Sequence, residues 1–513
     1  MATYYFNPIA GSDSNNGLTP ALAKASFDVF RANNLGTFGD TFLLHRGMEH
    51  VVANRNLPSG NSLGNPTTVE SYGEAQVPYA IVKAGSSVAA LNISQRNYTL
   101  LKNILFDGNG LTVPVYISST ATNSSTGHRV QRCKFTNSAG DNPGLYIGRE
   151  NTTNTSTDYI VEDCEFYDNA ASGITLMAVQ NAIIRRCKAW RNGASGIGGG
   201  HGIHTQSRHI FHTSGWVLVT GTIYNRALPA FATDVFFVRH PSYPHMVKNT
   251  ATPTAPGVGE FGVDSGNLYV NVGANPNGPT MAYVWSVSSG IQYEFCEAFQ
   301  NLFGVAPFQE GHGLSFDDWT SDSVMKGCVS HNNEGRGFSI NGGTGNRLFG
   351  CIAYGNESVG FASGSGPSNT VRNCTFFNNN VGRGANAAEM LFDNTANNST
   401  VSNSILIGTS AIGINFGTAT GCVASTNGIS GFATAVSGGT VSGTITTDAR
   451  PYVRSDGSLI VPDTATIATV GTENPFATSG AYAAGVTLAN GRLRPGYAPV
   501  GAYMAVVPRS PRL

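Results

Sequence analysis

A repeat of about 23 residues runs through the middle of the chain and constrains its fold more than any other feature. Seven copies begin at a cysteine, and the intervals from Cys164 to Cys187, from Cys328 to Cys351 and from Cys351 to Cys374 are each 23 residues. Six copies carry an asparagine five residues after the cysteine: Asn169, Asn192, Asn301, Asn333, Asn356 and Asn379. The cleanest copies then start a new segment with a glycine and a hydrophobic residue, as at Gly337-Phe338 and Gly360-Phe361. Because these features keep phase over roughly 250 residues, we expect one solenoid.

A coil of short parallel strands explains each repeated residue. The cysteine and the residue two positions later face inward, where they stack on their equivalents about 4.8 Å away in the next turn of the coil. The asparagine is expected to turn a corner in the left-handed conformation and to form a ladder, and the glycine to permit tight entry into a strand. The repeat therefore predicts an all-β fold: a right-handed parallel β-helix with an inserted small β-rich module and a C-terminal β-rich cap. The eight cysteines are predicted to be reduced core residues, since no CxxC pair exists.

Composition narrows the classes of partner. Charged residues make up 12% of the 513, and the formal net charge is -1. This balance argues against nucleic acid, which calls for a basic surface. With 41% hydrophobic residues but no run of about 18 apolar ones, we expect neither disorder nor membrane insertion. No metal and no cofactor are expected, and a surface made polar by neutral groups suits carbohydrate.

The phase of the repeat divides the chain into five parts. Residues 1–85 are predicted to form an N-terminal cap and first turns, with a short helix around Ala23 to Asn33 and a strand at Thr41 to Leu44. Residues 86–206 and 289–410 form the two parts of the β-helix, and 207–288 form the inserted module. Residues 411–513 form C-terminal turns or a cap, with a candidate trimerisation segment. No signal peptide is visible at Met1-Ala2-Thr3, so we expect action inside the cell or release by another route.

Three segments carry a family resemblance: the opening Tyr5-Phe6-Asn7-Pro8 with Gly11-Ser12-Asp13-Ser14-Asn15-Asn16-Gly17, the stretch Glu70-Ser71-Tyr72-Gly73-Glu74, and the ending Pro499-Val500-Gly501-Ala502-Tyr503. The chain resembles the pectin-lyase-like β-helix superfamily, which includes polygalacturonases, pectate and alginate lyases, and phage tailspike depolymerases. It departs from polygalacturonases in lacking their Asn-Thr-Asp and Gly-Asp-Asp signatures, and no Asp-rich calcium cluster like that of pectate lyases is evident. It looks most like a tailspike or tail-fibre depolymerase. The resemblance implies a polysaccharide substrate, a homotrimer, and a virion tail component acting at the bacterial surface.

Two segments on either side of the insertion depart from the scaffold pattern. They are Gly200-His201-Gly202-Ile203-His204-Thr205-Gln206 and Glu310-Gly311-His312-Gly313-Leu314-Ser315-Phe316-Asp317-Asp318-Trp319. Aligning Gly202-Ile203 with Gly313-Leu314 places His204 over Ser315 and Gln206 over Asp317. With the hydrophobic residues inward, these four side chains are predicted to face outward on adjacent strands.

This patch contains the candidate site. The candidate catalytic residues are Asp317, Glu310, Asp318, His204 and His312. The candidate substrate-binding residues are His201, Gln206, Ser315, Trp319, Glu334, Arg336 and Asn341, with Trp319 as a sugar-stacking face. The same residues also admit a structural interpretation, in which the histidines form a stacking ladder and Asp317-Asp318 caps a strand.

Two reactions fit these residue types. Hydrolysis needs two carboxyl groups, which Asp317 with Glu310 or Asp318 would supply, and Glu334 is a further option. Elimination at a uronate needs a base and a cation, which His204 or His312 and Arg336 would supply. The carboxylates would repel an acidic substrate, so the sequence favours a glycoside hydrolase that cleaves bacterial capsular, exo- or O-antigen polysaccharide. A polysaccharide lyase, a non-catalytic glycan-binding adhesin and a purely structural solenoid are the alternatives.

Overall fold

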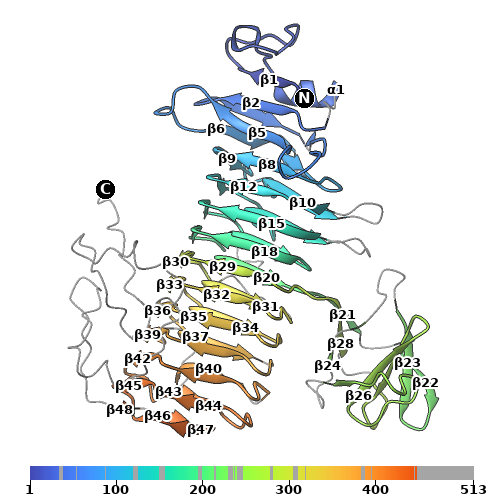
Figure 1. Cartoon of the computed structure of the whole chain (residues 1–513), viewed down its shortest axis with the longest axis vertical. Coiled ribbons are helices and arrows are strands. Elements are labelled where there is room, and N and C mark those ends of the chain that lie inside the picture. The colour runs from blue at the N-terminus through green and yellow to red at the C-terminus, as the bar shows by residue number, and fades with distance from the viewer. Residues whose placement is uncertain are drawn as a thin grey trace.

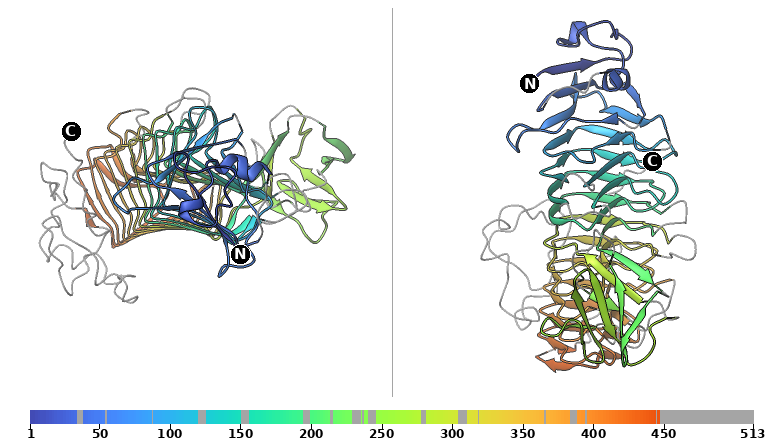
Figure 2. Two further views of the ribbon diagram at one scale, coloured as in Figure 1. Left: turned by 90° about the horizontal axis from the view of Figure 1, so that it is seen from above. Right: turned by 90° about the vertical axis from the view of Figure 1, so that its right-hand side faces the viewer.

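The computed structural model describes residues 1–446 except 34–37, 54, 87, 120–124, 150–155, 194–198, 213–214, 229–234, 236, 240–245, 278–280, 304–309, 318, 365, 383–387, 394 and 444. Within these residues the chain coils into a parallel β-helix whose turns, here called rungs, stack along one axis (Figure 1). Seen from above, the strands of successive rungs superpose (Figure 2). The all-β solenoid predicted from the repeat is confirmed, and no described helix is long and apolar enough to cross a membrane.

Each rung contributes one strand to each of three parallel sheets. The first sheet contains β1 (Thr3–Phe6), β2 (Thr41–His45), β5 (Thr67–Tyr72), β8 (Thr99–Lys102), β12 (Arg129–Gln131), β15 (Ser156–Glu162), β18 (Gln180–Arg185), β29 (Gln292–Glu294), β32 (Val324–Lys326), β35 (Arg347–Phe349), β38 (Thr370–Arg372), β41 (Thr400–Ser402), β44 (Val423–Ser425) and β47 (Thr440–Ser442), with β11 (Ser125–Thr126) beside β15. The second sheet contains β3 (Glu49–Val52), β6 (Ala80–Ala84), β9 (Ile104–Asp107), β13 (Lys134–Thr136), β16 (Glu165–Tyr167), β19 (Lys188–Trp190), β30 (Glu297–Phe299), β33 (Val329–His331), β36 (Ile352–Tyr354), β39 (Thr375–Phe377), β42 (Ile405–Ile407), β45 (Gly428–Ser430) and β48 (Ile445–Thr446). The third sheet contains β4 (Arg55–Asn56), β7 (Leu91–Asn92), β10 (Val115–Ser119), β14 (Leu145–Arg149), β17 (Ile174–Met177), β20 (Ile203–Gln206), β31 (Leu314–Asp317), β34 (Phe338–Asn341), β37 (Phe361–Gly364), β40 (Ala388–Phe392), β43 (Ile412–Asn415) and β46 (Thr434–Ser437).

A single hydrophobic core fills the inside of the coil, extending from Phe6 to Ile429. All eight cysteines are free and buried in the rungs, as predicted from their spacing. In two places a backbone N–H donates to the sulfur of the next rung, from Cys133 to Cys164 and from Cys351 to Cys374, each at 3.4 Å. The cysteines are therefore small core residues of a repeating scaffold.

The repeated asparagines form a buried ladder, as expected, but they do not turn the corner. The side-chain amide of Asn333 donates to Asn356 Oδ1 at 2.9 Å, and its own Oδ1 accepts from Asn301 at 2.8 Å. The left-handed conformation lies one residue earlier, for example at Asn332, whose φ is 53°. The expectation that the ladder asparagine itself adopts this conformation is wrong. The turn residue points outward, which leaves the next side chain inside to satisfy buried backbone groups.

The N-terminal end is closed by a 3-10 turn, η1 (Pro20–Leu22), and one short helix, α1 (Phe27–Asn33). Phe27 of α1 lies against Phe6 and Phe42 of the first two strands, with ring centroids 5.2 and 5.8 Å apart. This helix covers the end of the solenoid where the sequence predicts one.

The inserted module follows β20 and has its own hydrophobic core. One antiparallel sheet contains β21 (Arg208–His212), β28 (Met281–Ser286) and β24 (Phe237–Arg239), and a mixed sheet contains β22 (Val217–Thr220), β23 (Ile223–Ala227), β27 (Asn267–Asn271), β26 (Glu260–Asp264) and β25 (Val247–Lys248). Its core contains Trp216, Val235, Val238, Met246, Phe261, Leu268, Val270 and Val272. The module lies beside the rungs that follow it (Figures 1 and 2). Of the C-terminal part predicted at residues 411–513, the described residues up to 446 form further rungs, from β43 to β48. The rest, which includes the candidate trimerisation segment, lies outside the described residues.

Candidate functional site

The two unusual segments lie on neighbouring strands of the third sheet, β20 and β31. The register pairs Ile203 with Leu314, His204 with Ser315, and Gln206 with Asp317. This is the register predicted from the alignment of the two Gly–hydrophobic starts. The inserted module leaves and rejoins the coil between these strands, so residues far apart in the sequence meet on one face.

Alternation along the strands directs the polar side chains away from the main core. Thr205 faces inward, where its Oγ1 lies 2.5 Å from the hydroxyl of Tyr293, and Phe316 packs on the same tyrosine. His204 and Asp317 lie on the opposite face, as predicted. They are nevertheless buried, at 9% and 5% exposed, so the site is more enclosed than an open strand surface.

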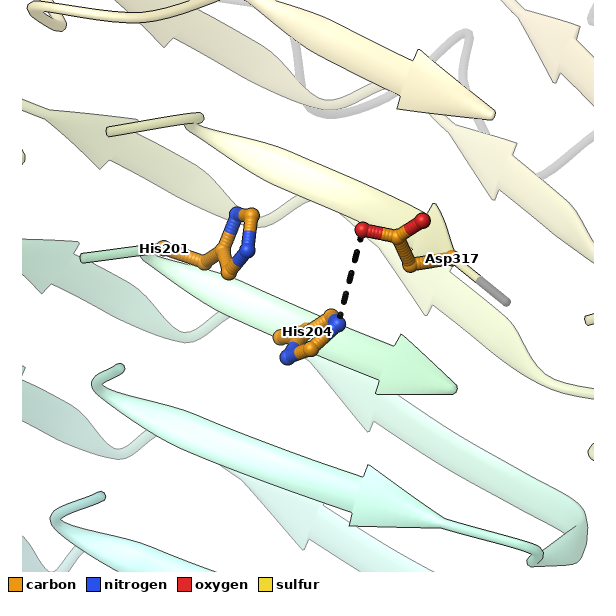
Figure 3. Close-up of side chains that lie close together, drawn as sticks. All are labelled: His201, His204 and Asp317. Atoms are coloured by element: carbon orange, nitrogen blue, oxygen red, sulfur yellow. Dashed lines mark ion pairs between the residues drawn. The ribbon is translucent and has the colours of Figure 1, made fainter. Parts of the chain in front are cut away.

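Three side chains converge at the centre of the site and are here called the His–Asp cluster: His201, His204 and Asp317 (Figure 3). His204 Nε2 lies 3.8 Å from Asp317 Oδ2, and the rings of His201 and His204 have centroids 4.3 Å apart. One nitrogen from each histidine and one carboxylate oxygen all lie within 4.8 Å of one another. His204 Nε2 is buried and has no hydrogen-bond partner, which is costly for a polar atom unless a ligand satisfies it.

The surroundings set the charge of this cluster. Burial, together with the proximity of His201, holds the pKa of His204 well below its ordinary value. His201 Nε2 lies 3.3 Å from the carboxylate of Glu310, and this contact is the main reason that the pKa of Glu310 is well below its usual range. Near neutral pH, His204 is therefore an uncharged imidazole, and Glu310 is an ionised carboxylate.

A second histidine lies beside the cluster and next to a cation. Burial first, and then the charge of Arg336, lower the pKa of His312 well below its ordinary value. His312 Nδ1 accepts a hydrogen bond from the backbone N–H of Arg336 at 3.1 Å, so the proton of the neutral ring is on Nε2. The Arg336 guanidinium donates to Ser339 Oγ at 3.1 Å, which holds it beside β34 of its own rung.

The other candidates occupy defined positions around this centre. Ser315 Oγ lies 3.5 Å from His201 Nδ1, and the backbone carbonyl of Gln206 accepts from Ser288 at 2.7 Å. Glu334 Oε2 accepts from the backbone N–H of Phe303 at 2.8 Å, so this carboxylate is engaged with a neighbouring loop. Asn341 ends β34, two residues beyond Ser339 on the same face.

Trp319 is 5% exposed and its ring lies against Gly342, where an added Cβ would stand 3.2 Å away. The prediction that it presents a sugar-stacking face is wrong, because the chain turns at φ 65° after β31 and folds the indole under the next rung. Asp318 lies outside the described residues, so its predicted catalytic role stays a prediction.

Two tyrosines that the repeat does not single out lie on the same face of the third sheet. The rings of Tyr116 and Tyr146 stack with centroids 4.6 Å apart, and Tyr146 pairs in register with Thr175, which pairs with His204. The Tyr146 hydroxyl lies 3.5 Å from the sulfur of Met177. An alignment of Val115-Tyr116-Ile117 with Leu145-Tyr146-Ile147 would have placed both tyrosines on this row.

The arrangement supports two kinds of chemistry. An uncharged imidazole next to a carboxylate has a free lone pair that can accept a proton. Burial makes His204 a weaker base than a free histidine, and the carboxylate stabilises the imidazolium that forms. Two imidazoles and a carboxylate that converge on one point are also the donor set of many transition-metal sites. Metal binding is difficult to predict from the sequence, because Asp317 is separated from His201 and His204 by the inserted module.

Comparisons with known proteins agree with this architecture. The family described as "right handed beta helix region" matches residues 76–211 and 284–429, which together are more than half of the chain. The A-module of the Azotobacter vinelandii mannuronan C-5 epimerase AlgE6 is 13% identical, with a TM-score of 0.50 over 82% of this chain and 93% of that chain. A structure of XylC with xylose is 9% identical, with a TM-score of 0.52 over 90% of each chain. No curated protein matches.

At these identities the two solved structures establish likeness of fold alone. The family match spans both halves of the coil and leaves out most of the inserted module. The description of this family also states that the helix is right-handed, which is the winding that the repeat predicts. The chain therefore belongs to the right-handed β-helix family.

Proposed function

We propose that this protein acts on polysaccharide at the outer face of the third sheet, and that it cleaves by elimination at a uronate residue. The observation that carries the proposal is the buried, unpartnered Nε2 of His204, 3.8 Å from the carboxylate of Asp317. A base held in this form has an available lone pair and a partner for the charge that it acquires.

Elimination assigns a role to each member of the site. His204 removes the proton from the carbon next to the uronate carboxyl group. The electron pair left on that carbon forms a carbon–carbon double bond, and the glycosidic bond on the adjacent carbon breaks. The departing oxygen takes up a proton, for which the Nε2–H of neutral His312 is a candidate donor. Asp317 stabilises the imidazolium on His204.

Arg336 matches the charge requirement of this reaction. Negative charge develops on the uronate carboxyl group as the proton leaves, and a fixed guanidinium next to it stabilises that charge. Arg336 is held by Ser339 and lies near enough to His312 to lower its pKa. The positive charge of Arg336 offsets the repulsion that Asp317 and Glu310 would exert on an acidic substrate, which was the reason to favour hydrolysis from the sequence.

The hydrolysis predicted from the sequence fits the geometry less well. It requires a carboxyl group whose pKa is raised so that it can protonate the leaving oxygen. Glu310 has the opposite property, because His201 lowers its pKa. Hydrolysis by Asp317 and Glu310 would require a protonated carboxyl group, whereas Glu310 is ionised. Elimination uses the site with its groups in the charge states described above.

The names of the two structural neighbours support carbohydrate as the substrate class. One is a mannuronan epimerase and the other was solved with xylose. The bacterial capsular, exo- or O-antigen polysaccharide predicted from the resemblance is part of this proposal, as are a trimeric state and action at the bacterial surface as a virion tail component. Light scattering on the full chain tests the trimer.

Product analysis tests the reaction. The full chain is incubated with polysaccharides that contain or lack uronates, while reducing ends and the ultraviolet absorbance of unsaturated uronates are recorded. We expect both signals on uronate polymers. Reducing ends without absorbance would indicate hydrolysis, and binding without either signal would indicate an adhesin.

Variants test the site. His204→Ala is expected to lower kcat by about 10²–10⁴-fold, the usual contribution of a general base. Arg336→Ala is expected to lower turnover of uronate polymers by a similar factor. His45→Gln removes a histidine from β2 of the first sheet and is the matched control, which should keep full activity. Full activity in His204→Ala would show that the site is wrong even if the reaction is right.

A further inference from the structure

We propose that the His–Asp cluster is a binding site for a divalent transition-metal ion of the zinc or cobalt type. The inference goes beyond the proposed function, because metal binding requires no substrate and no assigned base. It starts from an atom that protein groups leave unsatisfied, His204 Nε2, which is buried without a hydrogen-bond partner.

The separations fit one ion better than a hydrogen bond. The 3.8 Å between His204 Nε2 and Asp317 Oδ2 exceeds the reach of a hydrogen bond. In a tetrahedral site with bonds of about 2.0–2.2 Å from zinc to nitrogen and oxygen, two ligand atoms stand about 3.3–3.6 Å apart. The three ligand atoms all lie within 4.8 Å of one another, so side-chain shifts of up to about 1.5 Å bring them around one ion.

The donor atoms also indicate which kind of metal the site would bind. Two nitrogens with one carboxylate oxygen select an imidazole-binding metal over calcium or magnesium, which prefer all-oxygen sites. His204 and Asp317 lie on neighbouring strands of the same sheet, and His201 lies two residues before the first of these strands, so a rigid base holds the site.

Glu310 completes the arrangement. Histidines that bind metal usually contact a carboxylate or carbonyl that fixes the ring orientation. The Glu310 carboxylate lies 3.3 Å from His201 and is partly exposed. Three protein ligands leave further coordination positions open, as in catalytic rather than closed structural sites.

Direct metal binding tests the site. The full chain is freed of metal with a chelator, titrated with Co²⁺ while the visible spectrum is recorded, and titrated with Zn²⁺ by calorimetry. We expect one ion per chain, with a spectrum of cobalt bound to nitrogen and oxygen. Removal of a ligand should weaken binding by more than about 100-fold, since loss of even an outer partner typically costs 10–100-fold.

The variants separate this site from misfolding and from surface binding. His204→Ala and the isosteric Asp317→Asn should both lose the ion, Glu310→Gln should weaken binding by about 10-fold, and His45→Gln should bind like the unaltered chain. Circular dichroism of each metal-free variant reports folding. An absence of binding to the unaltered chain, or equal binding by folded His204→Ala or Asp317→Asn, would overturn the proposal.

The activity assay distinguishes this proposal from the proposed function. A bound ion occupies the lone pair that His204 needs as a base, so we expect Zn²⁺ to inhibit elimination and a chelator to restore it. If the chelator instead abolishes activity and Zn²⁺ restores it, the metal site is supported and the assignment of His204 as base fails.

Discussion

At the scale of single residues, the buried polar side chains carry most of the specific information in this fold. The asparagine ladder links six rungs, from Asn169 to Asn379, through side-chain amides. Each amide satisfies both the next asparagine and a backbone carbonyl of the rung before it. Removal of one member therefore leaves several buried groups without partners.

Asn333→Ala should lower the free energy of unfolding by about 2–4 kcal/mol. The change leaves the buried side-chain amide of Asn301 and the carbonyl of Ala298 without the hydrogen bonds that Asn333 makes to them. The neighbouring Asn332 is exposed and has a φ of 53°, so Asn332→Gly should change stability by less than about 1 kcal/mol. Urea denaturation of both variants gives the comparison. Equal effects would show that the ladder bonds contribute little.

Glu389 ends this ladder and is fully buried. It accepts hydrogen bonds from the backbone N–H and the side-chain amide of Asn379, while its Oε2 is buried without a partner. Burial raises the pKa of Glu389 from 4.5 to about 7. The protonated form is thus the one that fits the core.

Because the folded pKa is raised, the contribution of Glu389 to stability is fully present below about pH 4.5 and is lost as the pH rises to about 7. Glu389→Gln has no proton to lose, so this decline in stability, up to about 3 kcal/mol, should disappear. Urea midpoints between pH 4.5 and 8 measure the slope, with the surface variant Glu74→Gln as control. An unchanged slope in Glu389→Gln would contradict the assignment.

At the scale of elements, the strand starts and the inserted module decide where the site lies. The glycines that open β20 and β31 have no room for a side chain: a Cβ on Gly202 would stand 2.6 Å from the carbonyl of Gly313, and one on Gly313 would stand 1.9 Å from Ser330 Oγ. These close contacts align neighbouring strands and so set the register that brings His204 next to Asp317.

The inserted module is attached at one point and packs around its own core, so the coil should fold without it. Ser288 donates its backbone N–H to Ser207 Oγ at 2.8 Å, which holds the two ends of the insertion together. We expect replacement of residues 208–287 by a short glycine–serine linker to preserve the far-ultraviolet circular dichroism of the coil and to change its melting temperature by only a few degrees. Limited proteolysis gives a second measure. Failure of the shortened chain to fold would mean that the module stabilises the β20–β31 junction.

At the scale of the whole molecule, each rung contacts mainly the rungs before and after it. In such a solenoid, stability is close to a sum of local terms, and damage at one end is not transmitted far. The helix α1 closes the N-terminal end, whereas the candidate site lies many rungs away (Figure 1). A change that weakens the packing of α1 should therefore leave the activity of the candidate site unchanged.

Phe27→Ala opens a cavity between α1 and the first strands, a change that typically costs about 3–5 kcal/mol. We expect faster hydrogen exchange in β1 and β2, with exchange in β20 and β31 and the enzyme activity both unchanged. Exchange mass spectrometry resolves these segments. Faster exchange along the entire coil would show that the rungs unfold as a single unit.

The repeat by itself determined the solenoid, because its residues meet structural needs that recur from rung to rung. The cysteine fills the core, the asparagine forms hydrogen bonds to the neighbouring rungs, and the glycine stands where a side chain has no room. The same phase predicted the pairing of His204 with Ser315 and of Gln206 with Asp317. It did not identify the outward-pointing residue before each ladder asparagine as the left-handed one, since neighbouring polar residues look alike in sequence.

The chemistry of the site was decided only by the tertiary structure. Whether an outward side chain is exposed depends on what covers it, and Trp319 and His204 both turned out to be buried. The charge of Glu310 follows from its distance to His201, and the convergence of His201, His204 and Asp317 follows from how the strands on both sides of the insertion are seated. Periodicity specifies which face a residue occupies, whereas burial, protonation and ligand geometry depend on separations through space, which periodicity does not contain.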